Sequence, residues 1–140
     1  AAGQNIEVRP IGVGDAQEIE RGFSAFSPGP GDGIIVTATP LASVNRETII
    51  SLANRYKLPS VFPYRHFVLA GGLAAYGPDL VDPFRRAAIY VSRILRGEKP
   101  SDLPVQAPTG YSLALNMKTA AALGLNVPPT MVARADDVIE

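Results

Sequence analysis

The chain has 140 residues with 13 basic and 13 acidic side chains, so its net charge is zero and gives no electrostatic reason to expect nucleic acid or an acidic membrane as a partner. Its hydrophobic content of 46% allows a buried core and excludes a disordered or fibrous chain. The absence of cysteine excludes disulfides, thiolate metal sites and cysteine nucleophiles, and a single histidine excludes a multi-histidine metal centre within one copy, so we expect no cofactor.

No apolar run approaches the roughly 20 residues that a membrane-spanning helix needs. No basic segment followed by an apolar one marks a signal peptide either. Because the chain starts at Ala1 rather than at methionine, we expect that a leader has been trimmed.

The first half of the sequence alternates strand-like and helix-like patterns, as a parallel α/β unit does. Asp15 is suited to cap a helix with Glu18 as its capping-box partner, and a loop is expected over Pro40–Ser43. The run Ile34–Val36 is apolar at every position, which is typical of a strand covered on both faces. The expected strands are 5–11, 34–36, 60–62 and 73–76, and the expected helices are 16–26, 46–56 and 64–69. This order predicts an α/β fold with an open parallel sheet and helices on both faces.

The longest predicted helix follows over 79–97, capped by Asp79 or Asp82 and ended by Gly97. A proline-rich return over 103–109 leads to a strand at 111–116, a short helix at 117–123 and a last helical turn opened by Pro128 and Pro129. The apolar face of the long helix consists of Leu80, Phe84, Ala87, Ala88, Val91, Ile94 and Leu95. Such a helix is more than a small parallel sheet needs, which suggests that it packs against something else.

Catalytic and phosphate-binding patterns are weak. His66 is the sole candidate general base, and no Gly-x-Ser-x-Gly motif surrounds any serine, so a small hydrolase around His66 is a remote alternative. Gly12–Gly14 lacks the third glycine of a dinucleotide loop, and Gly29–Gly33 lacks the Lys-Ser/Thr of a phosphate loop. We therefore expect a protein that is not an enzyme.

A binding site is favoured at the carboxyl ends of the strands, where ligands bind in open parallel sheets. Arg65 could clamp a carboxylate, Thr37 and Thr39 could donate hydrogen bonds, and Tyr64 and Tyr76 could form stacking walls. The alternative is that the aromatic rings only close the end of the core while Arg65 faces water.

Residues 58–140 contain a series of short motifs. They are Gly71-Gly72-Leu73 with Tyr76-Gly77, the helix end Ile94-Leu95-Arg96-Gly97-Glu98-Lys99-Pro100, Asp102-Leu103-Pro104-Val105, Asn116 to Gly124, and Val127-Pro128. In this order they resemble the C-terminal part of ABC-transporter substrate-binding proteins of the uncharacterised, tryptophan/tyrosine-type periplasmic family. Residues 1–57 fit the preceding strand–helix pairs of the second lobe of that family, less distinctively.

The resemblance implies a two-lobed clamshell that holds an amino acid or an aromatic or carboxylate-like solute between its lobes and delivers it to an ABC permease in the inner membrane. Residues 1–140 would be the C-terminal lobe, with 77–109 as the hinge-crossing helix and return segment, and the N-terminal lobe would be missing. The family implies a periplasmic or lipid-anchored location. An uncovered 79–97 helix would favour homo-oligomers. The alternative function is a ligand-sensing regulatory domain of the same fold.

Overall fold

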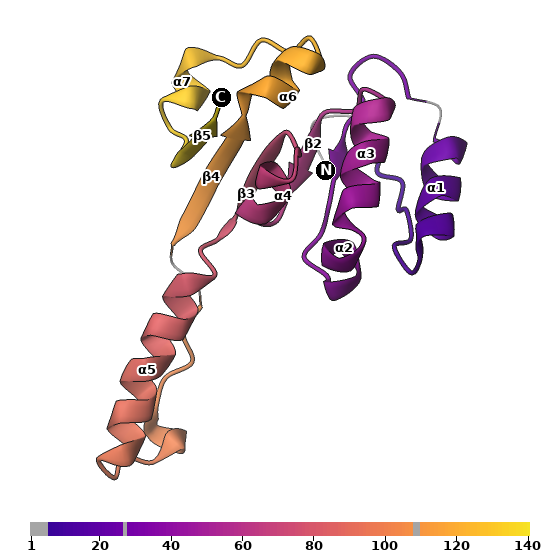
Figure 1. The fold of residues 1–140 in the computed structure, drawn as a ribbon. Helices are drawn as coiled ribbons and strands as arrows, with labels where there is room; N and C mark the ends of the chain where they lie inside the picture. Colours follow the sequence, from indigo (N-terminus) through magenta and orange to yellow (C-terminus); the bar gives the residue numbers. More distant parts are fainter. Residues whose placement is uncertain (1–5, 27, 108–109) are drawn as a thin grey trace.

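A computed structural model describes residues 6–26, 28–107 and 110–140. Five strands form one open sheet in the order β1-β2-β3-β4-β5 (Figure 1). Their bounds are β1 Ile34–Ile35, β2 Ser60–Phe62, β3 Ala74–Pro78, β4 Tyr111–Asn116 and β5 Asp137–Ile139. The predicted α/β class with an open sheet is confirmed. The sheet is mixed rather than wholly parallel, because β3 and β4 pair antiparallel while the other three pairs are parallel.

Seven α-helices and one short 3₁₀ helix lie among the described residues. They are α1 Ala16–Ala25, α2 Pro40–Val44, α3 Arg46–Arg55, α4 Arg65–Leu69, α5 Val81–Leu95, the 3₁₀ helix η1 Pro100–Asp102, α6 Met117–Ala122 and α7 Pro129–Val132. None of the helices in the described ranges is both long and apolar enough to cross a bilayer.

The start of α1 follows from its capping residues. The Asp15 carboxylate accepts a hydrogen bond from the Glu18 backbone N–H at 2.7 Å. The Glu18 carboxylate in turn accepts from the Gly14 backbone N–H at 2.7 Å, one residue before the position that a capping box uses. The Glu18 N–H, one of the unpaired N–H groups at the helix start, is thereby satisfied, and the predicted helix start is confirmed.

The main core lies on one face of the sheet, where Phe62 of β2 and Ala75 of β3 are buried. The helices on this face are α1, α3 and α4, which contribute Ile19, Phe23, Ile49, Ile50, Leu52, Ala53, Phe67 and Val68 to the same cluster. Over β4 the opposite face is also covered, since Leu115 is only 3% exposed and lies outside that cluster. Helix α6 contacts the neighbouring strand β5.

Several local predictions were wrong. The strand expected over 5–11 does not form in its described part, where Ile6 and Val8 are exposed, because a strand needs a neighbour to bond its backbone. The loop expected over Pro40–Ser43 is helix α2, because Pro40 takes its first position and the Thr39 hydroxyl accepts from the Ala42 N–H at 3.1 Å. Strand β5 was not expected at all.

Strand β1, which was predicted to be covered on both faces, is exposed on one of them. Ile35 is 82% exposed, because β1 lies at one end of the strand order and pairs with β2 alone among the described residues.

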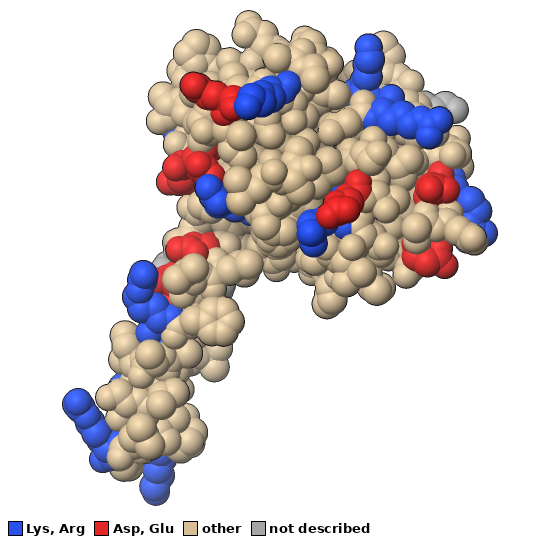
Figure 2. Space-filling model, in the orientation of Figure 1, with Lys and Arg blue, Asp and Glu red and all other residues tan. Residues whose placement is uncertain are grey.

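Helix α5 stands away from the rest of the molecule as an arm (Figures 1 and 2). The chain leaves the sheet at Pro78 and returns at Tyr111, and these two residues are partners in the β3–β4 ladder. No residue of α5 is buried, and the apolar side chains of Phe84 and Leu95 are 79% and 82% exposed. The arm therefore presents an apolar face that nothing in the described chain covers.

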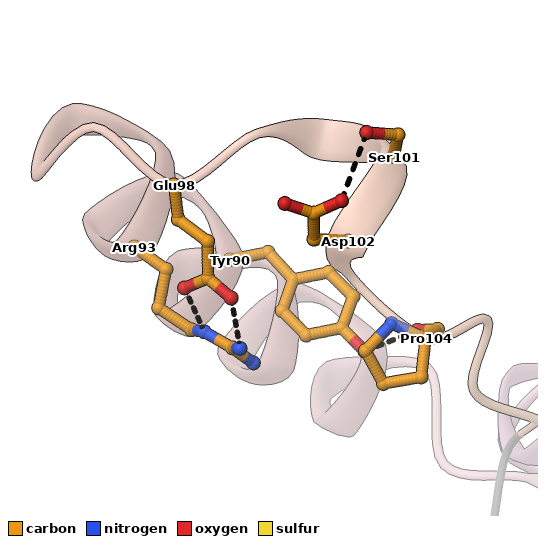
Figure 3. A network of polar contacts seen from close by, with 6 residues as sticks. All are labelled: Tyr90, Arg93, Glu98, Ser101, Asp102 and Pro104. Atoms are coloured by element: carbon orange, nitrogen blue, oxygen red, sulfur yellow. Dashed lines mark hydrogen bonds and ion pairs between the residues drawn. The ribbon is translucent and has the colours of Figure 1, made fainter.

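The return segment is tied to α5 by polar contacts (Figure 3). The Arg93 guanidinium donates to both carboxylate oxygens of Glu98, and the Tyr90 hydroxyl donates to the Pro104 carbonyl. The Glu98 carboxylate raises the pKa of Arg93 through this hydrogen bond. Since these contacts lie within residues 90–104, the helix and its return segment form one unit.

The point where the arm leaves the sheet has no room for a side chain at Gly77. A Cβ atom built there would lie 1.9 Å from the Pro63 carbonyl oxygen, and that oxygen belongs to the backbone. Only glycine lets β3 approach the end of β2 this closely.

We expect Gly77→Ala to lower the free energy of unfolding by about 2 kcal/mol or more, because the backbone must shift to accept the methyl group. Gly110→Ala is the matched control, since Gly110 lies across the base of the arm with nothing within 4 Å of its Cβ position. Urea unfolding followed by circular dichroism compares the two variants. Equal midpoints would show that the close approach at Gly77 is not a constraint.

Candidate functional site

The carboxyl edge of the sheet collects the loops after β1, β2 and β3. Because β4 and β5 run in the opposite direction to β3, their first residues, Tyr111 and Asp137, start from this same edge. All five residues predicted for the site, Thr37, Thr39, Tyr64, Arg65 and Tyr76, lie in or beside these strand ends.

Thr37 and Thr39 follow β1. Thr37 is exposed, whereas Thr39 is half-buried and caps α2 by accepting a hydrogen bond from the Ala42 N–H. The Thr39 N–H donates to the Thr37 carbonyl at 3.0 Å, which turns the chain into α2. A hydroxyl that accepts a bond keeps its own hydrogen as a donor, so the capping role of Thr39 is compatible with ligand contact.

Tyr64 stands at the start of α4 and packs partly against the core. Its ring stacks on His66 with centroids 5.6 Å apart, and His66 stacks on the buried Phe67 at 4.6 Å. Burial lowers the pKa of His66 from its usual value, and the positive charge of Arg46 lowers it further. The histidine therefore favours its neutral form at the edge of an aromatic stack.

Arg65, the first residue of α4, has an intramolecular partner. Its Nε donates to the Asp137 carboxylate at the start of β5, so the ion pair joins α4 to the last strand in the sheet order. Sequence reasoning missed Asp137, because the two residues are 72 positions apart and the segment holding Asp137 was not expected to be a strand.

Tyr76 of β3 also has an unforeseen partner. Its ring stacks on that of Tyr111 in β4, with centroids 5.7 Å apart and planes inclined by 24°. Both rings are exposed, at the base of the arm. The alternation of β3 predicts that Tyr76 faces away from the buried Ala75, but only the antiparallel register brings Tyr111 beside it.

The structure thus places the five candidates along an open edge. Two shallow surface hollows lie elsewhere, one along Gln17–Ala25 of α1 and one beside Asn54 and Lys118–Leu123, and neither includes a candidate residue. In the parts of the chain that the structure describes, no three His, Asp or Glu side chains gather in a way that could hold a metal ion. Charged, hydroxyl and aromatic groups on an open edge are suited to one side of a binding cleft.

Comparison with known proteins gives a family. The family model described as ABC transporter substrate binding protein matches residues 1–139. No curated protein matches the chain.

Solved structures match the fold closely. A conserved domain protein from Vibrio cholerae is 28% identical, with a TM-score of 0.77 over 88% of this chain and 41% of its own. An ABC domain in complex with L-Trp from Streptococcus pneumonia is 26% identical, with a TM-score of 0.76 over 89% of this chain and 40% of its own. A ligand-free, open substrate-binding protein with adhesive properties from Clostridium difficile shares the fold at 23% identity, with a TM-score of 0.65 over 89% of this chain and 41% of its own. The chain spans about two fifths of these relatives.

We expect the pKa of His66 to lie below its usual value of about 6.5 and to rise partway back in Arg46→Gln, which removes the nearby positive charge. His66 is the only histidine, so NMR titration of its ring protons reads the pKa directly. Because a lowered folded-state pKa means that the folded state resists protonation, the stability of the fold falls as the pH drops through about 6.5 and below. Arg85→Gln on α5 is the control, and an identical shift in both variants would contradict the assigned cause.

Proposed function

The chain belongs to the family of ABC transporter substrate-binding proteins, and from that premise we propose that it is the C-terminal lobe of a two-lobed protein that captures a small organic solute for an ABC importer. The observation that carries the proposal is the family match over residues 1–139 in a chain that spans only 40–41% of its solved relatives. The family is named for binding a substrate, and we propose no enzymatic activity for the chain.

The arm supports the two-lobed arrangement. The chain leaves the sheet at Pro78 and re-enters it at Tyr111, which are partners in β3 and β4, as a hinge crossing would. Residues 108 and 109 of the proposed 77–109 crossing lie outside the described residues. The exposed apolar face of α5 is of the kind that a second lobe would bury. We propose that this face packs on the N-terminal lobe and that the strand ends at the arm's base act as the hinge.

The carboxyl edge would form one wall of the cleft. Arg65 is proposed to bind a carboxylate of the solute, and its pairing with Asp137 is compatible with that role. The bond to Asp137 uses Nε, and a guanidinium carries five N–H donors in all. Thr37 and Thr39 would donate hydrogen bonds, and Tyr64 and Tyr76 would stack on the solute.

The proposed solute class is an amino acid or an aromatic or carboxylate-like molecule. The relative solved in complex with L-Trp supports this class, as do the tyrosines and the arginine at the edge. The proposed location is the periplasm or the cell envelope, and the proposed partner is the permease of the importer.

In the full-length two-lobed protein, we expect Arg65→Ala to weaken binding of an anionic solute by about 1.5–3 kcal/mol, the range for a charge-assisted hydrogen bond. Calorimetric titration with L-tryptophan and then with a panel of amino acids and aromatic acids measures the effect. Arg55→Ala is the control, since Arg55 is exposed at the far end of α3, away from the carboxyl edge. Unchanged affinity in Arg65→Ala would remove the anion-binding role, and a panel without any ligand would count against the solute-binding proposal.

For the 140-residue chain alone, we expect self-association through the face of α5 that the second lobe would otherwise cover. Replacing the exposed apolar pair by Phe84→Gln with Leu95→Gln should return the chain to a monomer in multi-angle light scattering. The matched control, Arg85→Gln with Arg96→Gln, changes α5 outside its apolar face and should leave the association unchanged. A monomeric parent chain would contradict the packing argument.

A further inference from the structure

The ion pair of Arg65 with Asp137 joins two well-anchored elements at the carboxyl edge of the sheet. Arg65 lies in the first turn of α4, and Phe67 and Val68 of the same helix are completely buried in the core. Asp137 begins β5 and pairs with Ala114 of β4. Because the backbone is anchored at both ends of the contact, the ion pair limits the motion of the long Arg65 side chain.

The residue before Asp137 fixes the start of β5. The Asp136 N–H donates to the Leu113 carbonyl, and the Asp136 carboxylate accepts from the Leu113 N–H, both at 2.8 Å. The two neighbouring acids therefore differ in their contacts. The carboxylate of Asp136 bonds to the backbone of β4, whereas the carboxylate of Asp137 bonds to the guanidinium of Arg65.

The Arg65–Asp137 pair contributes little to folding. The two side chains are 54% and 30% exposed, and water screens an ion pair with this much exposure. Its larger effect is on the conformation of Arg65. A free arginine side chain populates many rotamers, and a ligand that binds it must pay for their loss. A guanidinium that is already held at one end loses less conformational freedom when it binds a solute.

The hydrogen bond to Asp137 leaves the tip of the guanidinium available. It uses Nε, at the side of the planar fork. The two terminal nitrogen atoms carry the other N–H donors, and together they match the two oxygen atoms of a carboxylate. Asp137 therefore holds Arg65 without using the donors that a solute carboxylate would bind from the tip of the fork.

The ion pair also sets the local charge. Arg65 and Asp137 together are neutral, and the carboxylate of Asp136 adds a negative charge at the next residue. A solute that is only an anion is attracted by Arg65 but repelled by Asp137 close behind it. A solute with an ammonium group beside its carboxylate offsets this repulsion, because Asp137 attracts the ammonium group.

We propose that Asp137 is a positioning residue for Arg65 and that it makes the site select α-amino acids over carboxylic acids that lack the amine. This inference rests on the proposed solute-binding function and narrows its solute class. Asp137 acts in two separable ways, since its oxygen atom holds the guanidinium while its charge discriminates between solutes.

Two substitutions separate these effects in the full-length protein. Asp137→Asn keeps an oxygen acceptor for Nε but removes the charge, whereas Asp137→Ala removes both. NMR of protein labelled with ¹⁵N at arginine, with the Arg65 signal assigned from Arg65→Lys, follows the exchange of the Nε–H with water. We expect this exchange to be at least about tenfold faster in Asp137→Ala than in the parent protein or in Asp137→Asn. Equal rates in all three proteins would overturn the positioning role.

Pairs of solutes that differ only in the amine test the charge selectivity. The pairs are L-tryptophan with indolepropionate, L-phenylalanine with phenylpropionate, and L-leucine with isocaproate, and calorimetric titration gives the ratio of the two dissociation constants. In the parent protein we expect the amino acid to bind at least about tenfold more tightly, and this preference to fall at least about tenfold in Asp137→Asn.

Asp136→Asn is the matched control. It removes the same charge from the next residue and keeps an acceptor for the Leu113 N–H, so the preference should change by less than about threefold. An equal change in the two variants would assign the effect to overall charge rather than to Asp137. An affinity in Asp137→Asn that falls for both members of a pair, with an unchanged ratio, would leave Asp137 a structural role alone.

Either of these two results overturns the selectivity and leaves the proposed function in place. If the parent protein binds neither member of any pair, the proposed function is contradicted and the selectivity falls with it. The Nε–H measurement needs no solute, so it decides the positioning role of Asp137 separately.

Discussion

The antiparallel pairing of β3 with β4 is the constraint on which the rest of the architecture depends. It joins Ala74 to Leu115 at one end and Pro78 to Tyr111 at the other, and the Asp79 N–H donates to the Gly110 carbonyl at 3.2 Å just beyond. The excursion of α5 therefore leaves and returns through one narrow base. Because the two ends of the arm, Pro78 and Tyr111, are paired in the sheet, α5 extends away from the rest of the described chain. Its apolar face therefore stays exposed.

The buried side chain of Asn116, at the end of β4 that lies away from the arm, forms hydrogen bonds with two neighbouring segments. The Asn116 side chain donates to the Val68 carbonyl at 3.2 Å and accepts from the Thr119 N–H at 2.9 Å, which caps α6. The Thr119 hydroxyl and the Asn54 amide both donate to the Gly71 carbonyl. These bonds join α3, the end of α4 and α6. The two bonds of Asn116 are buried, so breaking either one leaves a buried group unsatisfied. These hydrogen bonds fix the end of the sheet opposite the carboxyl edge. The carboxyl edge itself carries the irregular loops in which the candidate binding residues lie.

Elements that depend on local pattern were predictable, and those that depend on distant partners were not. The cap at Asp15, the periodicity of α3 and the glycine after α5 act over a few residues, so sequence alone indicated α1, α3 and α5. The alternation in residues 6–11 indicated a strand that does not form, since strand formation also needs a neighbour. The candidate site divides in the same way. Its positions at the strand ends followed from the alternation of strands and helices, whereas the Arg65–Asp137 and Tyr76–Tyr111 contacts follow from pairings of β4 and β5 that no local pattern encodes.

The exposed apolar surfaces and the polar carboxyl edge lie on different parts of the described chain. The face of α5 and the Ile35 side chain of β1 are exposed and apolar, whereas the carboxyl edge carries charge, hydroxyl groups and tyrosine rings. In the proposed two-lobed protein, burial of the apolar surface would build a fixed structure, whereas the polar edge would gain its contacts only with a solute and an opposing wall. A ligand shifts the equilibrium between open and closed conformations of a protein only if it makes different contacts in the two. A solute bound to this edge alone would make the same contacts in both, so it could favour closure only by also contacting a second lobe. If β3–β4 is the hinge, as proposed, it would place that second lobe at the arm's end of the sheet, and the pairing of these two strands would also determine how the proposed cleft closes.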